Sequence, residues 1–221
     1  MKKKPKSALE QLLAIMARLR APNGCPWDRA QDHRTLRFHA VEEVYELLDA
    51  IEAGDDHELA EELGDLLLQI VFHTQMAEER GAFDFEAVCR LLVEKLIRRH
   101  PHVFGNVRNV DTAQAVWAQW DQIKKAEKAG SRVPRHSALD GIPKHLPALL
   151  RAEKLVKKAR KVGLLSPELV RRSSLSKREV ARRLFTLAAY AQGQRWSAEE
   201  LLRAEARRVE RQLRRKERQL T

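Results

Sequence analysis

Apolar residues recur every three or four positions through most of the chain, which is the spacing of one face of an α-helix. No convincing alternation of apolar and polar residues, the pattern of a half-buried strand, accompanies this spacing. Leu, Ala, Glu, Arg and Lys dominate the composition, and these residues favour helices. The sequence therefore predicts an all-α fold with helices near 7–20, 35–53, 57–80, 85–100, after Asp111, and near 147–162, 176–192 and 197–219.

Glycine and proline divide this helical pattern. Residues 21–28 hold Pro22, Gly24 and Pro26 and are predicted to form a loop. Residues 129–147 are also rich in glycine and proline and are typical of a linker. The predicted organisation is a domain over 1–128, a linker over 129–147 and a second helical domain over 148–221.

Four carboxylates are placed symmetrically about the turn at Gly54. Glu43 and Glu46 precede it, and Glu62 and Asp65 follow it at matching distances. Each pair is spaced i, i+3 and so shares one helical face. If the two helices fold back on each other, four acids converge and repel unless a cation lies among them. Magnesium takes oxygen ligands and keeps positions open for phosphate oxygens, so the pattern indicates a metal-dependent phosphate enzyme.

The alternative is that these acids form an ordinary solvated helix face. Charged residues make up 33% of the chain, so either pair alone most often marks such a face. Both helices, however, carry apolar stripes beside the acids, and acids next to such a stripe become partly buried, which is costly without a partner. The functional interpretation is favoured. The stripes are Val41, Val44, Leu47, Leu48 and Ile51, then Leu59, Leu63, Leu66, Leu67 and Ile70.

The net charge of +11 belongs to the last third of the chain. Residues 151–221 hold 21 of the 42 Lys and Arg but 8 of the 31 Asp and Glu. Such asymmetry is typical of a surface that meets nucleic acid or another polyanion. The two cysteines form no C-x-x-C motif, and the apolar stretch at 66–72 is too short to cross a bilayer. We therefore expect a soluble, cytoplasmic protein without a membrane partner.

A weak internal repeat changes how the last third is interpreted. Residues 62–65 align with residues 179–182, and the apolar runs after the two segments also align. In this alignment Arg182 takes the place of Asp65, and an arginine there excludes a metal. The sequence thus predicts a shortened, degenerate second copy of the first domain. The alternative is a chance alignment of two amphipathic helices.

Several segments, taken together over residues 7–147, resemble the MazG family of nucleoside triphosphate pyrophosphohydrolases. The combination is highly specific, whereas E-x-x-E alone is not. Two departures stand out, Asp32 where the family usually has threonine, and Phe38-His39-Ala40 where it has a Pro-Tyr-aliphatic run. The matching segments are Gly24–Asp28 with Gln31 and His33, Glu42–Glu46, Glu61–Leu67, Lys95–Phe104, Trp120–Lys124 and His136–Pro143.

The resemblance implies an all-α fold whose core is a four-helix bundle, assembled as a tight homodimer. It implies magnesium, with manganese as an alternative ion, held by Glu43, Glu46, Glu62 and Asp65. It further implies a nucleoside triphosphate substrate cleaved between its α and β phosphates, which gives a nucleoside monophosphate and pyrophosphate.

Three residues beside the metal ligands have expected roles of their own. Glu42 and Glu61 each neighbour a ligand, and either is a candidate general base; the sequence does not choose between them. His39 lies one turn before Glu43 and is expected to contact substrate rather than metal.

Further substrate contacts are expected on two later helices. Lys95 and Arg99 lie one turn apart and can reach the same polyphosphate, whereas Arg98 points about 100° away and is expected to face the partner domain. The alternative for these residues is a basic last turn that complements the helix dipole. The family resemblance also implies that Trp120 stacks on the base and that Lys124 contacts a phosphate, although a tryptophan at helical spacing more often belongs to the core.

Two other functions remain open. The first is a weakly active or inactive nucleotide-binding regulator whose basic last third contacts nucleic acid or a protein partner. Few aromatic residues are interleaved with those basic residues, which disfavours single-stranded nucleic acid without excluding it. In the second alternative, residues 151–221 only complete the dimer or the bundle.

Overall fold

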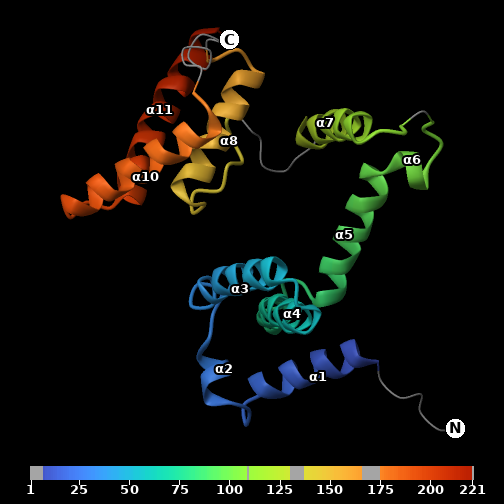
Figure 1. Cartoon of the computed structure of the whole chain (residues 1–221). Coiled ribbons are helices and arrows are strands. Elements are labelled where there is room, and N and C mark those ends of the chain that lie inside the picture. Colours follow the sequence, from blue (N-terminus) through green and yellow to red (C-terminus); the bar gives the residue numbers. More distant parts are fainter. Residues whose placement is uncertain (1–6, 109, 130–136, 166–174, 221) are drawn as a thin grey trace, which may run out of the picture. The chain divides into compact units, whose positions relative to one another are not determined.

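The computed structural model describes residues 7–108, 110–129, 137–165 and 175–220, and every regular element in these ranges is a helix (Figure 1). The predicted all-α class is confirmed. None of the helices in these ranges has the length and apolar character needed to cross a membrane. The helices are α1 (Ala8–Arg20), α2 (Pro26–Ala30), α3 (His39–Ala53), α4 (Asp56–Glu79), α5 (Phe85–Arg99), α6 (Pro101–Phe104), α7 (Ala113–Ala129), α8 (Ala148–Lys161), α10 (Lys177–Gly193) and α11 (Ala198–Leu220).

The chain divides into two compact units, Met1–Trp120 and Asp121–Thr221, so the boundary falls within α7. The predicted domain limits remain a prediction. Of the predicted linker, residues 130–136 lie outside the described ranges. From Ser137 to Pro147 the chain has no α-helix and leads directly into α8.

Local capping explains why the main helices begin and end where they do. Ser7 and Glu10 form a capping box at the start of α1, in which each side chain accepts a hydrogen bond from the other's backbone N–H. Asp55 caps α4 through the N–H groups of His57 and Glu58, and thereby satisfies donors that the helix itself leaves open. Gly54 ends α3 with φ of 71°, a left-handed conformation that glycine adopts without strain.

The predicted loop over 21–28 is partly wrong, because Pro26 begins the short helix α2 instead of breaking one. Proline is tolerated at the first helical position, where its missing N–H would have had no partner in any case. Pro101 does the same for α6, although α5 ends before it as predicted.

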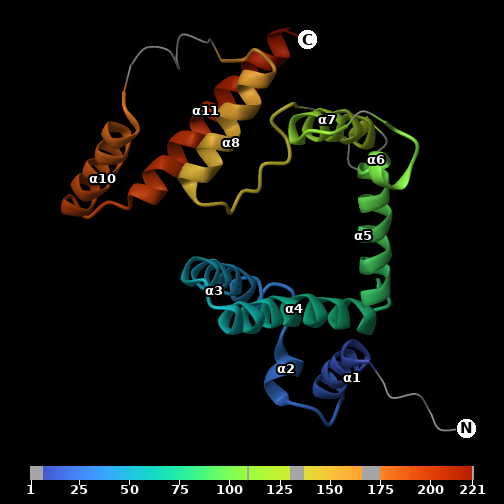
Figure 2. The same ribbon diagram turned by 45° about the vertical axis from the view of Figure 1, so that its right-hand side comes forward.

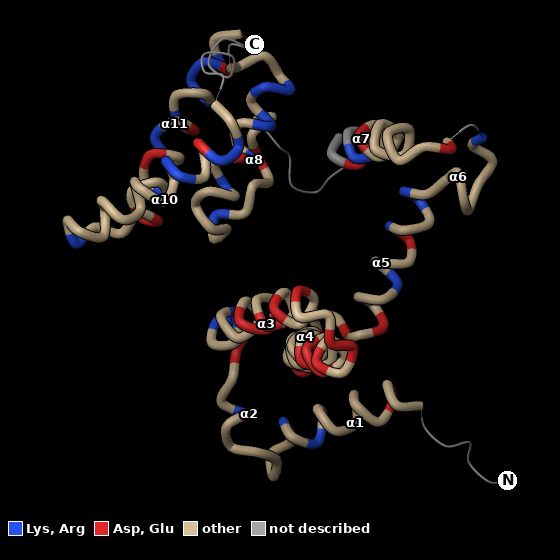
Figure 3. The backbone as a smooth tube through the Cα atoms, viewed as in Figure 1, with Lys and Arg blue, Asp and Glu red and all other residues tan. Residues whose placement is uncertain are grey.

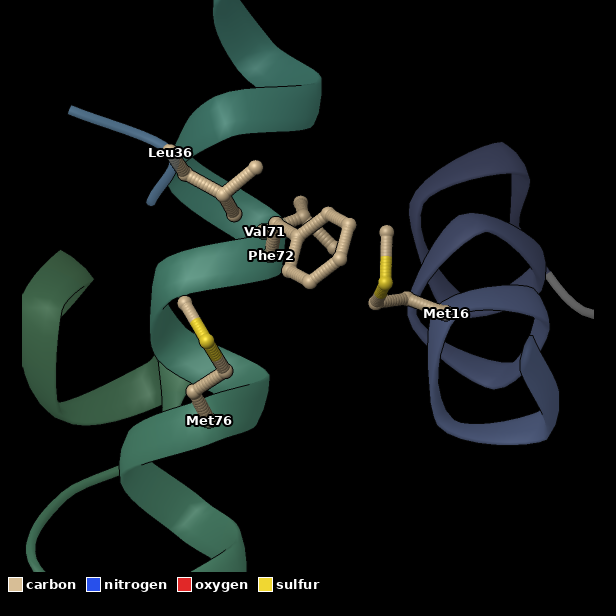
Figure 4. Packing of buried hydrophobic residues seen from close by; sticks show 5 residues of the cluster. All are labelled: Met16, Leu36, Val71, Phe72 and Met76. Atoms are coloured by element: carbon tan, nitrogen blue, oxygen red, sulfur yellow. The ribbon is translucent and has the colours of Figure 1, made fainter. Parts of the chain in front are cut away.

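The core of the first unit lies where α1 crosses the second half of α4. Met16, Val71, Phe72 and Met76 meet there with Leu36, which precedes α3 (Figure 4). Helix α4 also contacts α3 (Figures 1 and 2). The buried residues of α4 all lie in its second half, and its first half carries Glu62 and Asp65.

Arg20 ties the elements around this core together. Its Nε and Nη2 donate to the two carboxylate oxygens of Glu79 at 2.7 Å, and its Nη1 donates to the carbonyls of Asp28 and Gln31. The guanidinium also lies 5.4 Å from the ring centre of Phe72. One side chain thus joins α1, the segment around α2 and the end of α4. The bidentate pair holds the pKa of Glu79 below its usual range.

The second unit is built on α8 and α11, which lie side by side (Figure 2). Its buried cluster combines Leu155 and Ala159 of α8 with Leu213 of α11, and Leu139 and Leu164 from the segments flanking α8 complete it. The four-helix bundle implied by the family resemblance stays a prediction.

Candidate functional site

The acidic hairpin consists of α3, the turn at Gly54 and α4. Within it, Glu43, Glu62 and Asp65 each offer a carboxylate oxygen such that these atoms all lie within 4.8 Å of one another. Glu43 and Glu62 are half-buried and Asp65 is exposed. The fold-back of two helices predicted from the sequence therefore brings three of the four expected metal ligands together.

Glu46 is the fourth expected ligand and is not part of that group. Its side chain is exposed on α3, one turn beyond Glu43. It is still an electrostatic neighbour, because its charge helps to raise the pKa values of both Glu43 and Glu62. Three of the four acids thus cluster in the hairpin, and Glu46 lies close enough to act on the charges of Glu43 and Glu62.

The cluster is electrostatically uncompensated. Desolvation raises the pKa of Glu43, and repulsion from Asp65 and Glu46 raises it further. Desolvation also raises the pKa of Glu62, with repulsion from Glu46, Asp65 and Glu43. Among the described residues, none of the three clustered carboxylates has an ion-pair partner, and Glu62 Oε2 is buried without a hydrogen-bond donor. Such an arrangement is costly unless a cation completes it.

Gln69 is a neighbour of the cluster that sequence reasoning missed. It lies one turn after Asp65 on α4, is buried, and donates from Nε2 to Glu43 Oε1 at 3.1 Å. This hydrogen bond favours the ionised form of Glu43 and fixes its orientation. Gln69 follows Asp65 by four positions and Glu62 by seven, so it lies on the same face of α4. This spacing could have identified it from the sequence.

The donor set fits a hard divalent cation. Three carboxylates supply only oxygen, which suits magnesium, manganese or calcium and offers none of the nitrogen or sulfur ligands typical of structural zinc. Opposite ligands of a magnesium ion lie about 4.2 Å apart, given bonds near 2.1 Å. Separations of up to 4.8 Å need only small side-chain rotations to close around such an ion.

The two candidate bases project beside the cluster without entering it. Glu42 lies 3.5 Å from His39 on α3, and Glu61 lies 3.6 Å from His57 on α4. Both glutamates are exposed, so the structure does not distinguish them. The ring of His39 also meets Trp27 edge-on at 6.3 Å, which places the segment after Cys25 next to the start of α3.

Apart from His39 on α3, the expected substrate-binding residues lie on α5 and α7. Lys95 and Arg99 are half-buried on one side of α5, and Arg98 is exposed between them. Trp120, on α7, packs its ring edge-on against His100 at 5.2 Å, just beyond the end of α5. Lys124 lies one turn further along α7 and is half-buried. The contacts of these five residues with a substrate remain predictions.

The predicted counterpart of the acidic face in the second unit is fully paired. Arg182 and Arg183 of α10 both lie 2.9 Å from the carboxylate of Glu179. Their hydrogen bonds lower the pKa of Glu179, opposite to the shift of Glu62 with which it aligns. The degenerate repeat itself remains a prediction.

Comparison with known proteins bears on the part of the chain that holds the hairpin. Residues 31–104 match the family model described as the MazG nucleotide pyrophosphohydrolase domain. The chain is 50% identical over 156 residues to a nucleoside triphosphate pyrophosphohydrolase of Escherichia coli strain K12, a match that covers 70% of this chain and 58% of that protein. It is 47% identical over 154 residues to the nucleoside triphosphate pyrophosphohydrolase/pyrophosphatase MazG of Thermotoga maritima, with 70% and 57% covered. The chain thus spans little more than half the length of these relatives.

Proposed function

The chain belongs to the MazG family, and on this premise we propose that it is a hydrolase of nucleoside triphosphates. The proposed products are a nucleoside monophosphate and pyrophosphate. The observation that carries the proposal is the cluster of Glu43, Glu62 and Asp65, whose ligand oxygens lie within 4.8 Å of one another. Uncompensated acids in this position would have no structural benefit of their own.

In the proposed site, Glu43, Glu62 and Asp65 hold a divalent ion, and Glu46 joins them by a change of side-chain rotamer. When bound, magnesium or manganese supplies neutralisation of phosphate charge and acidifies a coordinated water. Gln69 keeps Glu43 oriented through the 3.1 Å hydrogen bond to Oε1, and the other carboxylate oxygen would be available to hold the ion.

The remaining steps of the proposal use side chains around the cluster. Glu42 or Glu61 accepts the proton of the attacking water, since both are exposed and adjacent to ligands. Lys95 and Arg99, one turn apart on α5, contact the phosphates that leave as pyrophosphate. Arg98 points about 100° away from these two residues and is proposed to reach the substrate only from the side that faces the partner domain.

Substrate contacts are proposed for three further residues. Trp120 offers an aromatic face for the base, and Lys124 follows one turn later as a phosphate contact. His39 lies at the start of α3, one turn before Glu43, and is proposed to contact substrate.

We also propose that the chain works as a homodimer, in which two copies complete the four-helix bundle. Support comes from apolar residues that the single chain leaves exposed on the two helices of the site and on α5. Many exposed large apolar side chains on neighbouring helices are typical of an interaction site. The residues are Val41, Val44, Tyr45, Leu48, Ile51, Leu63, Ile70, Leu91, Leu92, Val93, Leu96 and Ile97.

A cytosolic location is proposed on the state of the two cysteines. Cys25 and Cys89 are both free and half-buried. Free, partly accessible thiols are typical of a reducing compartment.

Product analysis tests the proposed activity directly. The purified chain is incubated with a panel of ribo- and deoxyribonucleoside triphosphates, with magnesium or with EDTA, and the products are separated by anion exchange. We expect monophosphate and pyrophosphate in equal amounts, and only with metal. Diphosphate and orthophosphate would contradict the assigned bond, and no turnover of any nucleotide would favour the regulatory alternative.

A further inference from the structure

The second unit contains a basic cavity of about 630 Å³ that lies outside the segment matched by the family model. Its walls come from the segment before α8, from α8 itself and from one face of α11. This volume falls within the range of ordinary small-molecule sites. The lining residues are Leu139, Asp140, Gly141, Ile142, Lys144, Arg151, Arg207, Glu210, Arg211 and Arg214.

The lining carries five cationic side chains and two carboxylates, a net charge of +3. Both carboxylates are already engaged. Glu210 accepts hydrogen bonds from Arg151 and Arg214, and Arg214 Nη1 also donates to Asp140 at 2.7 Å. The positive charge that remains uncompensated within the cavity belongs to Lys144, Arg207 and Arg211.

Arg151 shows that this is more than an exposed basic face. Its side chain is only 7% exposed, and it is ion-paired with Glu210 through Nη2. Its other terminal nitrogen, Nη1, is buried and has no hydrogen-bond acceptor among the described residues. A buried charged donor without an acceptor is unfavourable, so a ligand oxygen in the cavity would satisfy a need that the fold itself leaves open.

The walls of the cavity are fixed before any ligand arrives. Arg203 of α11 donates to the carbonyls of Lys144 and Leu146, and Glu217 accepts from the N–H of Ala138. Lys158 of α8 donates to the carbonyl of Asp140. Side chains of α8 and α11 therefore hold the segment before α8 in place through hydrogen bonds. Little conformational entropy is then lost when a ligand binds.

We propose that this cavity binds a compact anion with two linked phosphoryl groups, of the diphosphate class. A single phosphoryl group carries about −1.5 to −2 at neutral pH, so two are needed to balance a net charge of +3. Arg207 and Arg211 are separated by one turn, about 6 Å along α11, which suits two phosphoryl groups better than one. Arginine also binds phosphate oxygens in a bidentate manner, which lysine does not.

Figure 3 shows basic residues distributed along α8 and α11, so general attraction of polyanions is the main competing account. The test must separate the cavity from this background. Arg208 provides the matched control, because it neighbours Arg207 on α11, is exposed, pairs with Glu205 at 2.6 Å and does not line the cavity. Arg208→Ala removes the same charge from the same helix as Arg207→Ala or Arg211→Ala.

The experiment is calorimetric titration of the full chain with inorganic pyrophosphate in EDTA, which leaves the acidic hairpin without metal. We expect one site per chain, weakened about tenfold or more by Arg207→Ala or Arg211→Ala and less than twofold by Arg208→Ala. Thermal unfolding confirms that the exposed substitutions leave the fold intact. ADP in place of pyrophosphate shows whether the diphosphate is recognised free or as part of a nucleotide, and tighter binding of either supports the proposal.

Three results would overturn it. Absence of binding at millimolar pyrophosphate excludes the site. Equal weakening by Arg208→Ala assigns the binding to the diffuse charge of α11. Orthophosphate binding as tight as pyrophosphate rejects the two-phosphoryl ligand.

Discussion

The two units use the same kinds of charged residue in opposite ways. In the hairpin of α3 and α4, Glu43 and Glu62 approach other acids, and desolvation with mutual repulsion raises their pKa values. Between α8 and α11, burial likewise disfavours ionised Glu210, but hydrogen bonds from Arg214 and Arg151 outweigh it and its pKa is lowered. Composition alone does not separate these cases, since both helix pairs are dense in charge.

The difference lies in which groups have partners. Carboxylates with paired arginines stabilise the fold, and their removal should cost folding free energy. Carboxylates that repel one another do not stabilise the fold. Their removal should therefore lower activity and leave the free energy of unfolding unchanged or higher. In the second unit the group left over is a cation, which is why the two regions are proposed to take ligands of opposite charge.

The largest effect is expected from Glu210→Gln, which removes the counter-charge of the buried Arg151. Breaking a buried ion pair by changing one partner costs about 3–5 kcal/mol. Glu205→Gln is the matched control on the same helix, because its ion pair with Arg208 is exposed to solvent and should contribute little to folding stability. Urea unfolding followed by circular dichroism measures both. Equal midpoints for the two variants would mean that Arg151 does not depend on Glu210.

Glu62→Gln should reverse that pattern. It removes a proposed metal ligand, and because loss of an outer-shell partner alone costs 10- to 100-fold, we expect turnover to fall by at least about 100-fold. In EDTA its unfolding midpoint should not decrease, since one source of repulsion is gone. Metal-induced thermal stabilisation, which we expect for the unmodified chain, should disappear in this variant.

Glu58→Ala is the control for that substitution. Glu58 is an exposed acid on α4, one turn before Glu62, and lies outside the cluster. It should retain turnover and metal-induced stabilisation. Full activity in both Glu62→Gln and Asp65→Asn would refute the site.

The sequence predicted local features well and long-range pairing poorly. Helical spacing located α3 and α4. The symmetry about Gly54 predicted that acids of the two helices converge, and Glu43, Glu62 and Asp65 do lie together. Pro26 was misjudged because a proline that breaks a helix and one that begins a helix look alike without the following turn. Arg151 and Glu210 lie 59 residues apart, and no periodicity relates them. Their pairing depends on how α8 and α11 pack.

Gln69 offers a finer test of the hairpin. Gln69→Leu keeps the volume but removes the donor to Glu43, so Glu43 loses its orientation and a hydrogen bond that favours its ionised form. We expect about a tenfold loss of metal affinity, the lower end for an outer-shell partner, measured as the magnesium concentration that gives half-maximal turnover. Gln75→Leu, further along α4 and hydrogen-bonded to Glu79, should leave that concentration unchanged.

The smallest effect concerns Glu79, a paired carboxylate within the unit that holds the unpaired ones. The hydrogen bonds from Arg20 lower its pKa, so its contribution to stability is present above the pKa of the unfolded chain, about 4.3, and is lost as pH falls through the lower folded value. Arg20→Met removes the stabilisation that depends on ionised Glu79. The unfolding free energy of this variant should therefore fall less steeply with acidification than that of the unmodified chain. Arg29→Met, on the exposed side of α2, should keep the original slope. If the unfolding free energy of all three proteins fell with the same slope below pH 5, Arg20 would not stabilise ionised Glu79. Ion pairing would then no longer explain why the pKa values of acids in the same unit shift in opposite directions.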